Sequence, residues 1–222
     1  IGRLVGSEMC IRDSACALAD SGAVSCWGAD DAGQVSDIPE ALFARISASA
    51  QATCGVSTQG EVSCWGAVDA ELDAAFAYAT FIDIDGGSDG YCAMTDEGEV
   101  RCTTVDYAPQ ETGFASMSVG GLEATGACAV DDEGALTCWG DAPLYPPRDA
   151  FAFVSISNRH ACGVTVNGDT RCWGEFVADD EIDGYPSGVV FEELEVGHHN
   201  ACGIDGSNTL YCWGRADTAI GG

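Results

Sequence analysis

Cysteine is the residue whose type and spacing most clearly point to chemistry in this chain. Thirteen of the 222 residues are cysteines, and twelve of them form six pairs whose members are always ten positions apart. Cysteines at a fixed spacing can form disulfides, bind zinc or supply a reactive thiolate. The six pairs are Cys16 and Cys26, Cys54 and Cys64, Cys92 and Cys102, Cys128 and Cys138, Cys162 and Cys172, and Cys202 and Cys212.

Disulfide formation is the interpretation that fits this spacing best. Zinc sites usually place cysteines two to four residues apart with histidine nearby, and the sequence has no such cluster. Two helices with cysteines ten apart are disfavoured because a glycine midway between the cysteines would interrupt a helix. Reduced core cysteines remain the alternative. So many cysteines predict an oxidising compartment, which is extracellular, periplasmic or cell-surface. Cys10 lies outside the pattern.

The residues between the paired cysteines predict a β-hairpin. Apolar residues alternate with other types, which is the pattern of strands. The sixth position after the first cysteine is glycine in five copies and Asn208 in the last, so this position is expected to have positive φ. A three-residue turn at this point places Thr165 opposite Asp169 and Cys162 opposite Cys172, which makes a direct cross-strand disulfide possible. The five glycines are Gly22, Gly60, Gly98, Gly134 and Gly168.

A further strand is expected before each hairpin except the first. Successive first cysteines lie 34 to 40 residues apart, and a unit of one strand and one hairpin cannot bury both of its faces alone. Stacking six such units radially gives an all-β fold, a β-propeller with one cross-strand disulfide per hairpin. The expected strands are 43–47, 81–85, 114–119, 153–157 and 191–196, and the hairpins are 16–26, 54–64, 92–102, 128–138, 162–172 and 202–212.

The repeat also resembles a known family. CALADSGAVSCWGADDAGQ (Cys16 to Gln34) and FVSISNRHACGV (Phe153 to Val164) are similar to the repeat of the regulator of chromosome condensation family, and most similar to its bacterial, cysteine-bearing branch. The resemblance implies a propeller, usually of seven blades, and a structural role for His160. It also implies protein–protein recognition, either in nucleotide exchange on a small GTPase or in inhibition of β-lactamases. The third copy departs from the pattern, because Thr103 follows its second cysteine where Trp is expected.

The chain is expected to be a fragment of a seven-bladed ring, with a closed six-bladed ring as the alternative. Residues 1–14 are expected to be an artefact or an irregular N-terminal segment, and residues 15–222 a single β-propeller domain. No apolar run is as long as a transmembrane helix.

Charge and histidine count limit the possible functions. Thirty-six acidic residues against eight basic ones give a formal net charge of −28, which disfavours binding to nucleic acid and to anionic lipid. The acidic clusters match no known calcium-loop spacing, and His198 and His199 are interpreted as a solvated loop rather than a metal site. No catalytic set of Ser, His and Asp or of Cys and His is found, so we expect no enzyme, no metal and no cofactor. The five tryptophans occupy one repeated position and are expected to pack between blades.

The connections between hairpins are the expected recognition surface. Segments 141–148 and 175–185 carry aromatic residues among charged ones, as exposed binding loops do. We therefore predict a monomeric, extracellular or cell-envelope propeller that binds a protein through these loops on one face. The alternatives are a structural repeat module of a larger surface protein, a family-type regulator, and a propeller hydrolase or lyase. The candidate partner-binding residues are Tyr145, Arg148, Phe176 and Tyr185.

Overall fold

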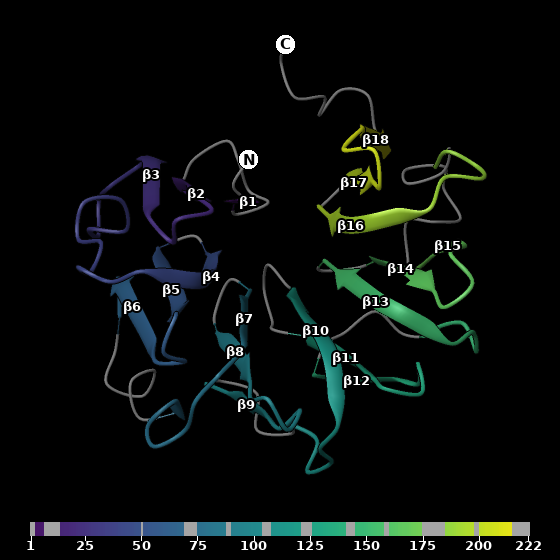
Figure 1. The fold of residues 1–222 in the computed structure, drawn as a ribbon, viewed down its shortest axis with the longest axis horizontal. Helices are drawn as coiled ribbons and strands as arrows, with labels where there is room; N and C mark the ends of the chain where they lie inside the picture. The colour runs from purple at the N-terminus through teal and green to yellow at the C-terminus, as the bar shows by residue number, and fades with distance from the viewer. Residues whose placement is uncertain are drawn as a thin grey trace. The chain divides into compact units, whose positions relative to one another are not determined.

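The structure is a computed structural model in which eighteen strands of the described residues form six three-stranded antiparallel sheets (Figure 1). We call the sheets blades and number them 1 to 6 in chain order. The chain separates into two compact units, 1–113 and 114–222, each with three blades. In the described part, no helix is long and apolar enough to cross a membrane. The structure describes residues 3–6, 14–49, 51–68, 75–87, 90–103, 108–120, 126–140, 145–157, 160–174, 185–197 and 200–214.

Unit 1 contains blades 1 to 3, and in each blade the strands pair in chain order. Residues 3–6 pair with the first hairpin, within the segment 1–14 that was expected to be an artefact or an irregular N-terminal segment. Cys10 lies outside the described residues. The strands are β1 (Arg3–Gly6), β2 (Ser14–Leu18) and β3 (Val24–Gly28) in blade 1; β4 (Phe43–Ala48), β5 (Ala52–Ser57) and β6 (Val62–Gly66) in blade 2; and β7 (Asp83–Gly86), β8 (Tyr91–Met94) and β9 (Val100–Cys102) in blade 3.

Unit 2 contains blades 4 to 6 with the same strand order. Figure 1 shows their first strands following one another, and these strands are in contact within the unit. The strands are β10 (Phe114–Gly120), β11 (Gly126–Asp131) and β12 (Leu136–Gly140) in blade 4; β13 (Phe151–Ile156), β14 (His160–Thr165) and β15 (Thr170–Gly174) in blade 5; and β16 (Phe191–Val196), β17 (Asn200–Asp205) and β18 (Leu210–Gly214) in blade 6.

The predicted hairpin register and disulfide pairing are confirmed in every blade. In blade 5, Cys162 pairs with Cys172 and Val164 with Thr170, and the backbone N–H of Thr165 donates to the carbonyl of Asp169 over 2.8 Å. The paired cysteines have Cα atoms 4.0 to 4.1 Å apart, close to the short separation of a non-hydrogen-bonded antiparallel pair. Each of the six disulfides therefore links the two strands of its own hairpin.

The turn position has positive φ in all six hairpins, as predicted, with Asn208 at 60° in the last. A second constraint comes from the next blade: a Cβ added at Gly134 would lie 3.0 Å from the carbonyl oxygen of Phe151. The carbonyl of this glycine also accepts a 2.8 Å hydrogen bond from the N–H of Phe151. Phe43 donates to Gly22 in the same way. In these two places the turn of one blade is therefore the attachment point for the first strand of the next.

The residue three positions after each first cysteine supports the turn, a feature that the sequence analysis did not use. Thr165 Oγ1 accepts a hydrogen bond from the N–H of Asp169, and Asp205 Oδ1 accepts hydrogen bonds from the N–H groups of Ser207 and Thr209. Side-chain oxygens of Ser, Thr and Asp commonly make such turns. The six residues at this position are Ala19, Ser57, Thr95, Asp131, Thr165 and Asp205, so only the first hairpin lacks the oxygen.

Two first strands begin elsewhere than the sequence predicts. Strand β13 starts at Phe151 rather than Phe153, because Phe151 pairs opposite Thr165 and a bulge follows it. Strand β7 starts at Asp83 rather than Phe81, although the N–H of Phe81 still donates to the carbonyl of Gly60. In both blades the buried phenylalanine lies eleven residues before the first cysteine, and this constant spacing is the signal that identifies it.

The core lies between successive blades. In unit 2, Cys128 and Val130 of blade 4 pack with Phe151, Val154 and Trp173 of blade 5. Blades 1 and 2 and blades 5 and 6 repeat this layer with equivalent residues. The prediction that the tryptophans pack between blades is confirmed at Trp65, Trp173 and Trp213. Trp27 of blade 1 differs, because 49% of its surface is exposed.

Candidate functional site

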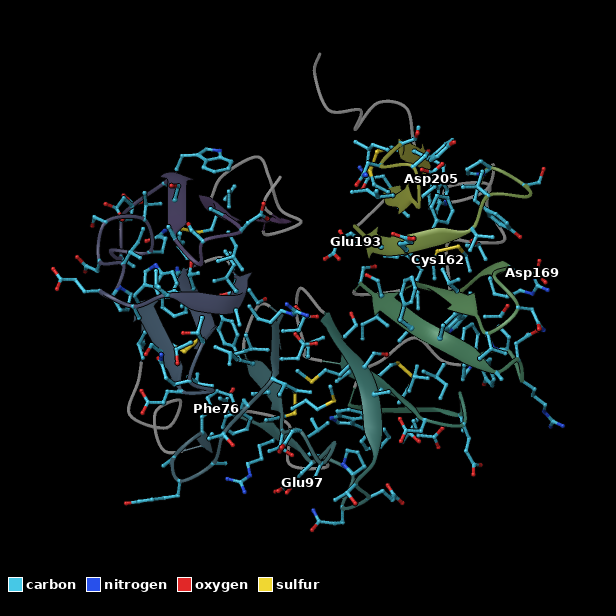
Figure 2. The ribbon with its side chains drawn as sticks, in the orientation of Figure 1. Phe76, Glu97, Cys162, Asp169, Glu193 and Asp205 are labelled. Atoms are coloured by element: carbon cyan, nitrogen blue, oxygen red, sulfur yellow. A yellow bond between two sulfur atoms is a disulfide. The ribbon has the colours of Figure 1, made fainter. Side chains whose placement is uncertain are left out.

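Unit 1 contains a groove of about 670 Å³ at the turn ends of blades 2 and 3. Its walls come from the turn between β5 and β6, from the connection before β7, and from the hairpin of β8 and β9. Figure 2 labels Phe76 and Glu97, which both lie on the outer side of this unit, at the lower left of the view. The lining residues with functional side chains are Glu61, Phe76, Tyr78, Glu97, Glu99 and Arg101.

The groove has an aromatic base. Phe76 is 7% exposed and makes an edge-on contact with Phe81, whose ring centroid lies 5.5 Å away. Phe81 belongs to the buried layer between blades 2 and 3, so the base is fixed by the core. Tyr78 also lines the groove, but its side chain is fully exposed to solvent and its φ is 64°. A bulky residue with positive φ is uncommon.

The charged residues of the groove carry three carboxylates and one guanidinium. Arg101 Nε lies 2.9 Å from Glu99 Oε1, and Nη1 of Arg101 donates to the carbonyl of Ala77 over 3.4 Å. The hydrogen bond from Arg101 holds the pKa of Glu99 below its ordinary value. Glu61 and Glu97 make no ion pair with any described residue. The groove is therefore acidic overall, with an aromatic base.

The residues predicted for partner binding lie in unit 2, on two different connections. Tyr145 is 89% exposed with φ of 65°, and Arg148 is exposed on the same connection before β13. Tyr185 precedes β16 and is only partly exposed, because it packs against the layer between blades 5 and 6. Phe176 lies outside the described residues. Tyr145 and Arg148 thus share one exposed connection, whereas Tyr185 is partly used by the core.

Of the three histidines considered in the sequence, only His160 lies among the described residues. His160 is fully buried, and its Nδ1 lies 3.2 Å from the hydroxyl of Ser157, which fits the structural role expected for it. His198 and His199 lie outside the described residues. Within the described ranges, no group of three or more His, Cys, Asp or Glu side chains could hold a metal ion.

The groove could not be predicted from the sequence for a physical reason. Its lining residues belong to three segments that come together only after blades 2 and 3 have packed, and no motif links them. The signal available was the combination of Phe76 and Tyr78 in the connection that precedes the third copy, the copy without tryptophan.

These features define a class: a β-propeller whose blades are three-stranded and each closed by a cross-strand disulfide. The predicted all-β propeller is thereby confirmed. No protein-family model matches the chain, and no curated protein matches its sequence.

Solved structures share this fold. The CRINKLY WD40 ectodomain of the receptor kinase ACR4 from Arabidopsis thaliana is similar with a TM-score of 0.71 and 25% identity, over 90% of this chain and 76% of that one. The entire ectodomain of the receptor kinase CR4 from Physcomitrella patens gives 0.71 and 23% identity over 91% of this chain. The match covers only 59% of the moss ectodomain.

Yeast RCC1 (Prp20), in a structure with Kap60, gives a TM-score of 0.70 and 13% identity, over 95% of this chain and 69% of that one. The resemblance to the regulator of chromosome condensation repeat is therefore confirmed at the level of the fold. Assignment to the bacterial branch stays a prediction.

Proposed function

We propose that this chain is a protein-binding propeller of an oxidising compartment, extracellular or in the cell envelope, and that its inter-hairpin connections contact the partner. The carrying observation is the connection before β13. There the side chain of Tyr145 is 89% exposed and is followed by exposed Arg148, on a blade held rigid by a disulfide and a packed layer. Tyr and Arg are among the residue types enriched at the positions that contribute most of the binding energy of protein interfaces.

The comparisons support this proposal. Yeast RCC1 is seen bound to Kap60, and a second structure of yeast Prp20p was described together with its binding to Gsp1p and histones. The two plant structures are ectodomains of receptor kinases, which fits a disulfide-bearing propeller outside the cytosol. Disulfides persist in such compartments and are rare in the cytosol.

Partner capture tests the proposal. The full chain is immobilised with its disulfides intact and exposed to extract from the native compartment, beside a Tyr145→Ala/Arg148→Ala variant. We expect a saturable protein partner whose capture falls at least about tenfold in the variant, because truncating an interface anchor costs about 2 kcal/mol. Leu210→Ala is the control. Leu210 is also exposed, at 59% of its surface, but it lies on strand β18 and not on a connection between hairpins.

Two outcomes would overturn the proposal. Equal capture by the variant and the parent chain would remove the connection before β13 from the interface. Recovery of the native protein from a reducing compartment, with free thiols at the paired cysteines, would contradict the proposed location.

A further inference from the structure

The negative charge of the groove in unit 1 is balanced only in part by the residues that the structure describes. Of its three carboxylates, Glu99 is paired with Arg101, whereas Glu61 and Glu97 have no ion-pair partner in the part of the chain that the structure describes. The whole chain has a formal net charge of −28, so the long-range field also favours a cationic group here.

Arg101 shows how this surface already holds a guanidinium. Its Cζ lies 6.0 Å from the centre of the Phe81 ring, and Nε and Nη2 lie 2.9 and 3.4 Å from the two carboxylate oxygens of Glu99. An aromatic face and a carboxylate together bind the planar fork of arginine better than the compact ammonium of lysine.

The groove contains a second aromatic ring and two further carboxylates that hold no guanidinium among the described residues. Tyr78 supplies an aromatic ring that is fully exposed to solvent, and Glu61 and Glu97 supply the carboxylates. The backbone of Tyr78 has a φ of 64°, a conformation that asparagine or glycine would adopt more readily than tyrosine. Local folding preference therefore does not explain why a tyrosine stands at this position.

We propose that this groove binds an arginine side chain from an extended segment of a partner protein. The guanidinium packs against Tyr78 and pairs with Glu61 and Glu97, while the flanking aliphatic part of the side chain covers Phe76. This inference rests on the proposed function only in taking a protein as the source of the arginine, and it concerns different residues from Tyr145 and Arg148.

A short peptide provides the test. The probe is a blocked pentapeptide with one central arginine between glycines, compared with the same peptide carrying citrulline, which has the same shape without the charge. NMR titration of the full chain should show saturable shifts of the Tyr78 and Phe76 ring signals with the arginine peptide. The citrulline peptide should bind at least about fivefold more weakly, and raising the salt from low to molar concentration should weaken the arginine peptide further.

Substitutions assign the binding to named groups. Glu61→Gln/Glu97→Gln should weaken the arginine peptide about fivefold or more, whereas Glu193→Gln on β16 of unit 2 should leave it unchanged. Tyr78→Phe should retain most of the binding, because the ring face is kept, and Tyr78→Gly should lose about fivefold. Tyr78→Gly should also leave the thermal midpoint unchanged or higher, since glycine suits the backbone at this position. Loss of binding in that variant therefore does not reflect loss of folding.

The outcomes separate the two proposals. Equal binding of the arginine and citrulline peptides, or ring shifts that persist in Glu61→Gln/Glu97→Gln, would overturn the arginine site. A native partner that still depends on Tyr145 and Arg148 would then leave the proposed function intact. Peptide binding in the groove together with unchanged capture by Tyr145→Ala/Arg148→Ala would retain the arginine site and reject that interface.

Discussion

Blades 3 and 5 have the same strand order and an equivalent disulfide. They differ in which strand of the hairpin carries the large aromatic side chain that packs against the preceding blade. In blade 5 the small Ala161 lies opposite Trp173. In blade 3 the large residue is Tyr91 on the earlier strand, and Thr103 stands where tryptophan occurs in the other copies. Tyr91 is 3% exposed and belongs to the layer between blades 2 and 3. The missing tryptophan at position 103 is therefore compensated by a large aromatic residue, Tyr91, at the opposite position of the strand pair.

The exchange also changes how the polar atom of the aromatic ring is satisfied. The hydroxyl of Tyr91 donates to the carbonyl of Ala52 over 2.7 Å and lies 2.8 Å from Ser49 Oγ, both in unit 1. Burial raises the pKa of the Tyr91 hydroxyl above its ordinary value, so it remains a donor. Trp173 Nε1 is buried with no hydrogen-bond partner among the described residues. Blade 3 thus meets the requirement for buried polar groups more completely than blade 5.

The largest expected effect comes from removing the ring. Tyr91→Ala should lower the free energy of unfolding by about 3–5 kcal/mol, because it leaves a cavity in a packed layer. Trp173→Ala should lose a similar amount in blade 5. Denaturant unfolding of the oxidised chain measures both values.

Exchange across the pair gives the decisive control for this prediction. If volume is what matters, Tyr91→Ala/Thr103→Trp should recover at least about 1 kcal/mol relative to Tyr91→Ala. If the loss of unfolding free energy in the double variant equals the sum of the losses in Tyr91→Ala and Thr103→Trp, Tyr91 and the missing tryptophan are unrelated.

The next largest effect concerns the disulfides, which the two blades share. Replacing both cysteines by alanine should cost about 3 kcal/mol in either blade, because each bridge closes a loop of the same length. The measurement is again denaturant unfolding, applied to Cys92→Ala/Cys102→Ala and to Cys162→Ala/Cys172→Ala. A loss confined to one blade would mean that the aromatic layer, and not loop closure, decides the contribution of the bridge.

A smaller effect is expected from the Tyr91 hydroxyl. Tyr91→Phe keeps the ring but removes one of three donors to the buried carbonyl of Ala52, which still accepts hydrogen bonds from the N–H and the hydroxyl of Ser49. The free energy of unfolding should therefore fall by about 0.5–1.5 kcal/mol. Tyr211→Phe is the matched control, because the hydroxyl of Tyr211 donates to Asp205 at a partly exposed site. Equal losses in the two variants would argue against a special role for burial at Tyr91.

The smallest expected effect distinguishes the turns of blades 5 and 6. Hydrogen bonds from the Ser207 hydroxyl and the Thr209 N–H lower the pKa of Asp205 to about 2, whereas Thr165 holds the equivalent turn of blade 5 without a charge. A folded pKa below the ordinary value of about 3.9 stabilises the fold above pH 4, and this contribution disappears as the pH falls through 2. Carboxyl NMR titration should find the low pKa. Asp205→Thr should reduce the acid sensitivity of blade 6, and an unchanged acid profile would contradict the role of Asp205.

The hairpins could be predicted from the sequence because they are local. The turn residue lies six positions after each first cysteine, and positive φ at Gly168 and Asn208 fixes the register that brings the cysteines together. The stacking of the blades followed from the period of the repeat. The starts of β7 and β13 lie two residues from the predicted positions. Alternation alone could not decide between Phe151 and Phe153, and Phe81 is hydrogen-bonded to the turn at Gly60 without a partner in the register of β8.

The groove and the exchange in blade 3 were beyond the sequence because they depend on pairs of distant residues. Thr103 read alone is a departure from a motif, and its meaning appears only when Tyr91 is found across the strand pair. Glu61 and Glu97 belong to turns of different blades, 36 positions apart in the sequence, and both turns line one groove. Variable connections such as 75–80 carry no repeated pattern from which these contacts could be deduced.

The hydrogen bonds that Phe43, Phe81 and Phe151 donate to the preceding turn have a consequence for biosynthesis. The acceptor carbonyls of Gly22 and Gly60 always come earlier in the chain than the donors, Phe43 and Phe81. During translation the turn of one blade is therefore made before the strand that docks on it, and its disulfide needs only cysteines that have already emerged. Blades 2, 3 and 5 can therefore each be added to a turn that is already complete.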